Sequence, residues 1–88
     1  MEALSERYLR YLAVLNLAPG TIKNHRFYLR RFFEFLREHN INDVAAVTRE
    51  TVRHYQTRLY EHINRRGEPD SVSTQNSGLK TVKAFLRF

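Results

Sequence analysis

Residues 21–39, TIKNHRFYLRRFFEFLREH, decide the fold, because they carry the clearest helical pattern in the chain. Apolar side chains recur there every three or four residues, which places them on one face of an α-helix. That stripe consists of Ile22, Leu29, Phe32, Phe33 and Leu36. The opposite face is polar and mostly basic, with Lys23, Arg30, Arg31, Glu34 and Arg37. Pro19-Gly20 forms a turn just before this helix, and Thr21 is its predicted N-cap.

Three further helices are predicted on either side. The first covers about residues 2–16, with an inner face of Leu4, Tyr8, Leu12 and Leu15. Val44–Val47 is predicted to form one extra short helical turn. Thr48 then caps a third helix over about 49–64, whose inner face is Val52, Tyr55, Leu59 and Ile63. Strand-type alternation is absent from the sequence, so the fold class is all-α.

The fourth helix follows a polar loop at residues 65–70, and either Ser73 or Ser71 is its predicted N-cap. Its apolar stripe is Leu79, Val82, Phe85 and Leu86. The pattern continues to Phe88 with no glycine or proline to end the helix. We therefore expect residues 1–88 to form a single domain, and a larger protein to continue beyond it.

Composition narrows the classes of function. The 88 residues include no cysteine, which excludes a disulfide framework and a thiolate metal site. No apolar run approaches the ~18 residues that cross a bilayer, so we expect a cytoplasmic protein without a membrane partner. Fifteen Lys and Arg against nine Asp and Glu give a net charge of +6. No acid lies between Glu6 and Glu34 or after Asp70, so nucleic acid as the partner and an ordinary solvated surface are both open interpretations of the charge.

The two acid-free segments supply the candidate DNA-binding residues. In the second helix they are Thr21, Lys23, Asn24 and Arg30. In the fourth helix they are Ser73, Thr74, Gln75, Asn76, Ser77, Lys80 and Lys83. Lys and Arg suit phosphates or guanine edges, whereas Asn and Gln can pair with adenine. The alternative is that these are ordinary exposed polar residues. Arg26 and Arg31 could equally pair with neighbouring acids.

Other candidate sites are weaker. Phe27 and Phe33 flank the main stripe of the second helix, so we expect them to be buried, or else to face a partner. Glu50 and His54 share a helix face without a third ligand, which predicts an ion pair and no metal. His62 and Arg65 have a His-x-x-Arg spacing that lacks the context of a catalytic site. We expect no cofactor and no catalytic residue in this chain.

The second and fourth helices resemble those of a known family. Pro19-Gly20-Thr21-Ile22, followed by Leu29-Arg30, Phe32, Phe35 and Leu36, resembles the N-terminal core-binding (SAM-like) domain of phage integrases, the tyrosine recombinases. Val47-Thr48 with Val52 and Tyr55 is similar to that family's third helix. Ser73-Thr74, Leu79, Val82-Lys83 and Phe85-Leu86 are similar to its fourth. The departures are His25 for tyrosine, Gln75 for an apolar residue, and Ser77-Gly78 where basic residues are common.

The resemblance implies a compact orthogonal four-helix bundle that binds double-stranded DNA. The second and fourth helices would enter the major groove, while a separate C-terminal catalytic domain, absent from this chain, would close the clamp and cut the strand. The full-length protein would act as a homotetramer on an inverted-repeat site. One alternative is a helical protein-interaction module anchored on Phe27, Phe33 and Tyr60. A helix-turn-helix regulator is disfavoured, because the link between the second and third helices is too long.

Overall fold

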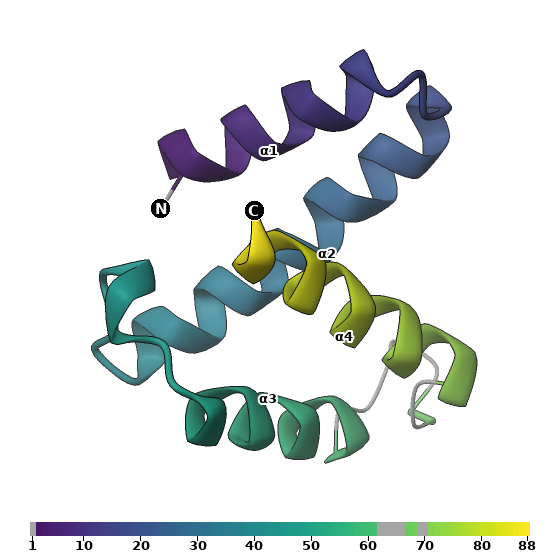
Figure 1. The fold of residues 1–88 in the computed structure, drawn as a ribbon. Helices are drawn as coiled ribbons and strands as arrows, with labels where there is room; N and C mark the ends of the chain where they lie inside the picture. The colour runs from purple at the N-terminus through teal and green to yellow at the C-terminus, as the bar shows by residue number, and fades with distance from the viewer. Residues whose placement is uncertain (1, 62–66, 69–70) are drawn as a thin grey trace.

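The structure, a computed structural model, describes residues 2–61, 67–68 and 71–88. Within these ranges it contains four α-helices and one short 3₁₀ helix, and no strand (Figure 1). The elements are α1 (Glu2–Val14), α2 (Pro19–Glu38), η1 (Val44–Ala46), α3 (Arg49–Glu61) and α4 (Val72–Arg87). The predicted all-α class and the extra helical turn are confirmed.

The longest helix, α2, is the centre of the fold. It packs against α1 on one side and against α4 on another, and α3 packs against α4. Figure 1 shows α4 crossing α2, with α1 and α3 at opposite ends of the molecule. The predicted orthogonal arrangement of four helices is confirmed. The first and third helices therefore stabilise the α2–α4 pair from its two ends.

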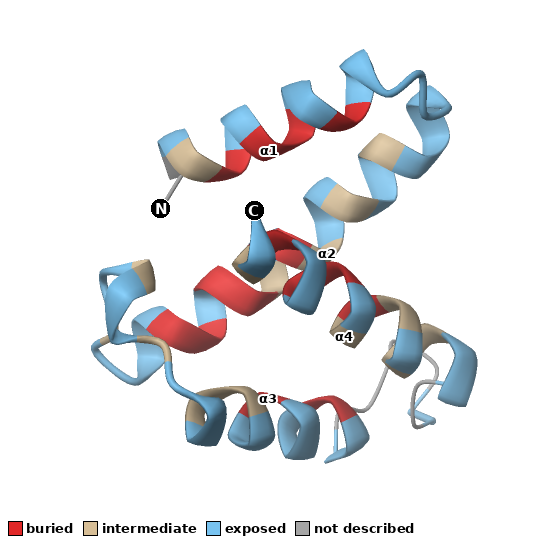
Figure 2. Cartoon of the chain, in the orientation of Figure 1, coloured by how far each residue is buried: buried red, intermediate tan, exposed pale blue. Residues whose placement is uncertain are grey.

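The core is built mainly from α2, which buries Leu29, Phe32, Phe33, Phe35 and Leu36. Buried positions on all four helices face this centre (Figure 2). Edge-to-face aromatic pairs link the helices: the Phe32 and Tyr55 ring centroids lie 5.0 Å apart, and those of Phe33 and Phe85 lie 5.6 Å apart. Such pairs add to the stability gained from apolar burial alone.

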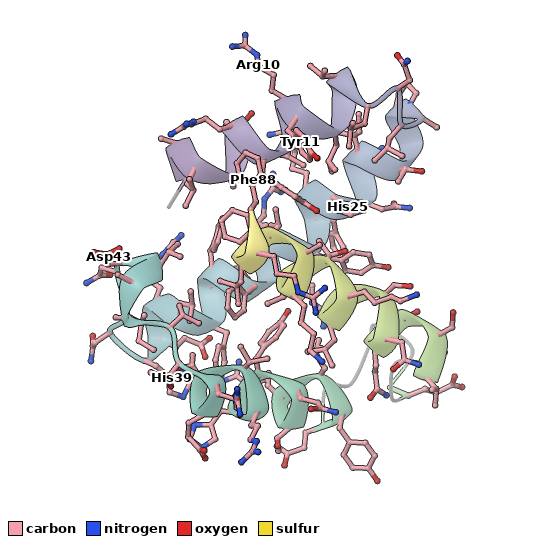
Figure 3. All side chains as sticks on the ribbon, viewed as in Figure 1. Arg10, Tyr11, His25, His39, Asp43 and Phe88 are labelled. Carbon is pink, nitrogen blue, oxygen red and sulfur yellow. The ribbon has the colours of Figure 1, made fainter. Side chains whose placement is uncertain are left out.

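A second aromatic contact joins α1 to the C-terminal end of α4. The Phe88 ring centroid lies 5.5 Å from that of Tyr8 and 5.3 Å from that of Tyr11. Figure 3 shows Phe88 between the end of α4 and Tyr11 on α1. This contact holds the first and last helices of the chain together.

The first helix ends at Val14, two residues earlier than predicted. Asn16 has a φ of 61°. Two backbone hydrogen bonds close the turn: the Asn16 N–H donates to the Ala13 carbonyl, and the Leu17 N–H donates to the Leu12 carbonyl. This is a Schellman motif, with asparagine in the left-handed position that ends many helices. Because the helix has ended, Leu15 turns outward and is 53% exposed, so its predicted core role is wrong.

The start of α2 also differs from the prediction. Thr21 is not the N-cap: the helix begins at Pro19, and the capping residue is Ala18 in an extended conformation without a side-chain hydrogen bond. Proline suits the first helical position, because its missing N–H would be unpaired there and its φ already matches a helix. The Thr21 side chain is therefore exposed in the first turn and free of a capping role.

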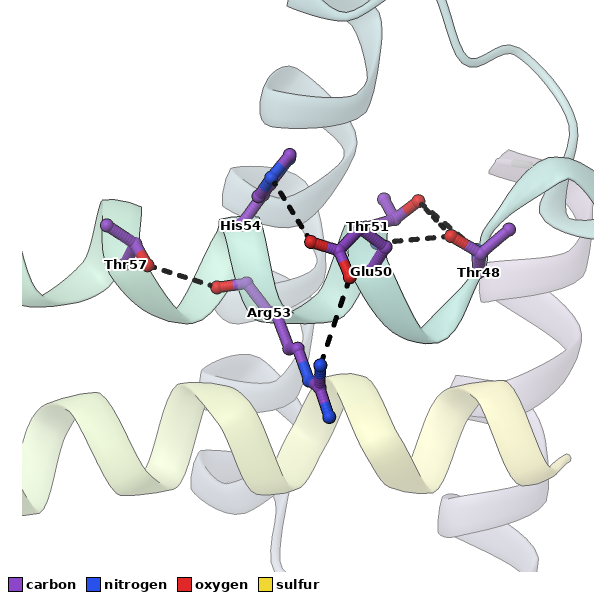
Figure 4. A network of polar contacts seen from close by, with 6 residues as sticks. All are labelled: Thr48, Glu50, Thr51, Arg53, His54 and Thr57. Carbon is purple, nitrogen blue, oxygen red and sulfur yellow. Dashed lines mark hydrogen bonds and ion pairs between the residues drawn. The ribbon is translucent and has the colours of Figure 1, made fainter.

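The caps of the last two helices are side chains. At α3, Thr51 N–H donates to Thr48 Oγ1 at 3.2 Å and Thr48 N–H donates to Thr51 Oγ1 at 3.1 Å (Figure 4). The predicted Thr48 cap is confirmed. At α4 the cap is Ser71, whose Oγ accepts from Thr74 N–H at 3.1 Å, and not the alternative Ser73. The predicted end of the third helix at Asn64 lies outside the described residues, as does Ile63.

Candidate nucleic-acid interface

An open groove of about 500 Å³ lies between the N-terminal half of α2 and the middle of α4. From α2 it is lined by Thr21, Asn24, His25 and Tyr28, and from α4 by Ser77, Lys80, Thr81 and Ala84. Four of the predicted DNA-binding residues thus meet on one surface: Thr21, Asn24, Ser77 and Lys80.

The two walls of the groove share one sequence spacing. Each helix contributes four residues at positions i, i+3, i+4 and i+7, which form one face of an α-helix. Gly78 lies where the two walls meet, and a Cβ built on it would be at an ordinary contact distance, 3.5 Å, from Tyr28 Cδ1. Thr81 is buried beside it and donates its hydroxyl hydrogen to the Ser77 carbonyl at 3.0 Å. The departure from the family pattern at Ser77-Gly78 thus lies in the part of α4 that faces α2.

Two predicted residues of α2 lie away from the groove. Arg30 lines a different cavity, of about 330 Å³, between α1 and α2, together with Arg26 and Arg37. Lys23 is exposed two residues after Thr21, which is roughly half a turn around the helix. Charge alone had grouped both with the groove residues, and the packing of α1 separates Arg30 from them.

The other predicted residues of α4 divide by helix face. Ser73 is exposed one turn before Ser77, on the groove side, and Asn76 and Lys83 are exposed next to that face. Thr74 is half-buried, and its hydroxyl is hydrogen bonded to Ser71 Oγ at 3.0 Å. Gln75 is also half-buried and shares a helix face with Leu79, which packs against the core. Thr74 and Gln75 therefore do not line the groove.

His25 gives the groove a neutral, apolar floor. Its Nδ1 is buried without a hydrogen-bond partner, and its ring centroid lies 6.1 Å from that of Tyr8. Burial lowers the pKa of His25 below its usual 6.5 and so favours the neutral imidazole. The positive charge of the groove comes from Lys80, with the Asn24 amide and the Thr21 and Ser77 hydroxyls as hydrogen-bonding groups.

The arginines and phenylalanines of α2 have separate roles. Arg26 forms an ion pair with Glu6 of α1, one of the two alternatives left open by the sequence. Phe33 is buried, as predicted, and so cannot anchor a protein-interaction module. Phe27 is 52% exposed, so its predicted burial is wrong, because its position turns it away from the core side of α2. Arg31 lies against it, with Cζ 5.7 Å from the ring centroid.

The remaining sequence hypotheses concern metals, catalysis and the membrane. Glu50 and His54 form the predicted ion pair, at 3.7 Å (Figure 4). Across the described ranges, no group of three His, Cys, Asp or Glu side chains is placed to hold a metal ion. His62 and Arg65 lie outside those ranges. None of the four described helices is long and apolar enough to span a bilayer.

The fold and the groove together define an all-α domain whose second and fourth helices present an open polar surface. The sequence profile of the family described as phage integrase, N-terminal SAM-like domain, matches residues 5–88, and the chain belongs to this family. No solved structure matches the chain significantly. The family resemblance of the two groove helices is thereby confirmed over almost the whole chain.

Curated relatives are tyrosine recombinases. The chain is 38% identical over 82 residues to tyrosine recombinase XerC of Halalkalibacterium halodurans, covering 92% of this chain and 25% of that protein. It is 34% identical over 90 residues to XerC of Oceanobacillus iheyensis, covering 100% of this chain and 27% of that protein. Tyrosine recombinase XerC 2 of Ralstonia nicotianae is 26% identical over 83 residues, 94% of this chain and 24% of its own length. The chain thus spans about a quarter of the length of these relatives.

Proposed function

We propose that this chain binds double-stranded DNA through the α2–α4 groove, as the N-terminal DNA-binding arm of a site-specific tyrosine recombinase. The observation that carries the proposal is the meeting of Asn24 and Lys80 in one groove, from segments far apart in the sequence. Both come from helices that family resemblance assigns to DNA contact. Neither residue caps a helix, since the N-caps of α2 and α4 are Ala18 and Ser71.

The chemistry of the groove suits a DNA duplex. The Lys80 ammonium can neutralise a phosphate, and the Asn24 amide can donate and accept hydrogen bonds at a base edge. Lys83, Asn76 and Ser73 extend the same surface along the exposed side of α4. An α-helix fits the major groove of B-form DNA, so either wall of the groove can be presented to the bases.

The rest of the parent protein would supply the chemistry. We assign strand cleavage to a catalytic domain outside these residues, and the present chain to binding without a cofactor. By analogy with the tyrosine recombinases, the parent would assemble as a homotetramer on an inverted-repeat site. We also propose that it acts in the cytoplasm.

A salt titration of DNA binding tests this function. Fluorescence anisotropy with a labelled duplex should give a Kd on the order of 10⁻⁴–10⁻⁶ M at physiological salt, the range of non-specific binding. The logarithm of the affinity should fall linearly with the logarithm of the salt concentration, with a slope of about 0.9 per phosphate contact. Lys80→Ala should reduce that slope by about one contact.

The matched control removes one positive charge elsewhere. Arg53 lies on α3, and its side chain is 70% exposed. If binding depends on the groove, Arg53→Ala will keep the wild-type slope and lose little affinity. Equal losses from Lys80→Ala and Arg53→Ala would mean that only net charge matters, and would contradict the proposed interface. No detectable binding at low salt would contradict the DNA-binding function itself.

A further inference from the structure

One large apolar side chain is exposed on α2 next to a residue that lines the groove. Phe27 is 52% exposed, and its ring meets the edge of Tyr28 at a centroid distance of 5.6 Å and an interplanar angle of 65°. Tyr28 itself lines the groove beside Asn24 and Lys80. The contact with Tyr28 therefore holds the Phe27 ring next to the proposed DNA-binding surface.

The ring lies between two cations. Lys23 is four residues before Phe27 and Arg31 four residues after it, so all three side chains share one face of α2. The Arg31 guanidinium carbon is 5.7 Å from the ring centroid, which restrains the ring by a cation–π contact. An apolar side chain flanked by Lys23 and Arg31 suits a polyanion that also offers an apolar group.

DNA offers one such group on its base edges. The major groove displays hydrogen-bond donors and acceptors from every base pair, and its apolar feature is the C5-methyl group of thymine. A phenylalanine ring cannot form a hydrogen bond with the other edges, and base faces inside a duplex are covered by stacking. The methyl group is therefore the part of the major groove that Phe27 can recognise.

We infer that Phe27 contacts a thymine methyl group in the bound duplex and so selects thymine at that position. The inference rests on the proposed DNA-binding function and adds a residue that reads sequence without a hydrogen bond. Asn24 and Lys80 would contact the duplex, and Phe27 would favour thymine over cytosine at the base pair that it meets.

The test removes methyl groups from the DNA. A preferred duplex is first selected from a random pool with the wild-type chain. Each thymine is then replaced singly by deoxyuracil, which lacks only the methyl group, and Kd is measured by fluorescence anisotropy. At one or two positions the wild-type chain should bind roughly four-fold more weakly, as expected for loss of one buried apolar carbon.

Variants assign the effect to the ring. Phe27→Ala should bind the thymine and deoxyuracil duplexes equally well, near the affinity of the wild type for deoxyuracil. Tyr60→Ala, which removes a 73% exposed ring from α3, should keep the wild-type difference. Circular dichroism melting checks that both variants fold.

The possible outcomes distinguish the proposed DNA-binding function from the inference about Phe27. Failure to bind any thymine duplex would overturn the DNA-binding function and this inference with it. Binding that is unaffected by every deoxyuracil replacement would overturn the inference alone. A methyl effect that persists in Phe27→Ala would also overturn it, because another residue would then read the methyl group.

Discussion

Replacing Gly78 with alanine is expected to stabilise the domain by about 1 kcal/mol. Glycine within a helix costs about that much relative to alanine, largely through the greater freedom of the unfolded chain. The site has room for the extra carbon: a Cβ would lie 3.5 Å from Tyr28 Cδ1 and 3.9 Å from Leu59 Cδ1, both ordinary contact distances. The gain in backbone entropy is therefore not offset by a clash.

The other two glycines are matched controls. Gly20 lies in the first turn of α2 with no atom within 4 Å of a built Cβ, so Gly20→Ala should give a smaller gain and no new contact. Gly67 has a φ of +75°, which side-chain-bearing residues rarely adopt. Gly67→Ala should therefore destabilise the domain by about 1 kcal/mol. The three substitutions add the same methyl group and differ in the local backbone and in the atoms around the added carbon.

Urea unfolding measures the effect. With a slope of about 1 kcal/mol per molar, Gly78→Ala should raise the midpoint by roughly 1 M. In a thermal melt the midpoint should rise by about 4–8 °C. A midpoint below that of the wild type would refute the reasoning, because it would mean that α4 has no room for a methyl group against Tyr28 of α2 and Leu59 of α3.

Two further predictions concern acid sensitivity and capping. Burial lowers the pKa of His25, so the unfolded chain binds that proton more tightly, and the free energy of unfolding should rise with pH in the range just below 6.5. His25→Phe should flatten that rise in urea midpoints measured across the range, and a curve parallel to the wild type would contradict this role. Ser71→Ala should cost about 1 kcal/mol through loss of the α4 cap, whereas Ser73→Ala should change stability by a few tenths. If thermal melts show that Ser73→Ala lowers stability more than Ser71→Ala, Ser73 and not Ser71 is the cap of α4.

The helices could be predicted from the sequence, but only some of their ends could: the end of α2 and the Thr48 cap of α3 agree with the prediction, whereas the end of α1 and the start of α2 do not. The stripe of α2 is long and regular enough to define the helix and most of its buried residues. Asn16 and Asn40 end α1 and α2 in the left-handed conformation, with φ values of 61° and 59°. Asparagine is also common in turns and exposed helix faces, so its presence alone does not fix where a helix stops. The cap of α2 was predicted at Thr21 instead of Ala18 for a similar reason, because proline is common both in turns before a helix and at the first position of a helix.

The candidate site was predicted in part. The two acid-free segments supplied Thr21 and Asn24 from the second helix and Ser77 and Lys80 from the fourth, and the structure brings these four residues together in one groove. Arg30 was grouped with them by charge, although it lies beside α1. A sequence shows which residues share a face of one helix, but the packing of the other helices decides which face stays open.

The arginine-lined cavity between α1 and α2 has a consequence for how the domain meets a polyanion. Arg30 and Arg37 lie there beside the Arg26–Glu6 ion pair, on a different side of α2 from Lys80 in the groove. The basic side chains are thus not confined to one side of the domain. If the domain binds DNA as we propose, distant attraction would bring it to the duplex without turning it toward the groove. Short-range shape and hydrogen bonding in the α2–α4 groove would then select the final orientation.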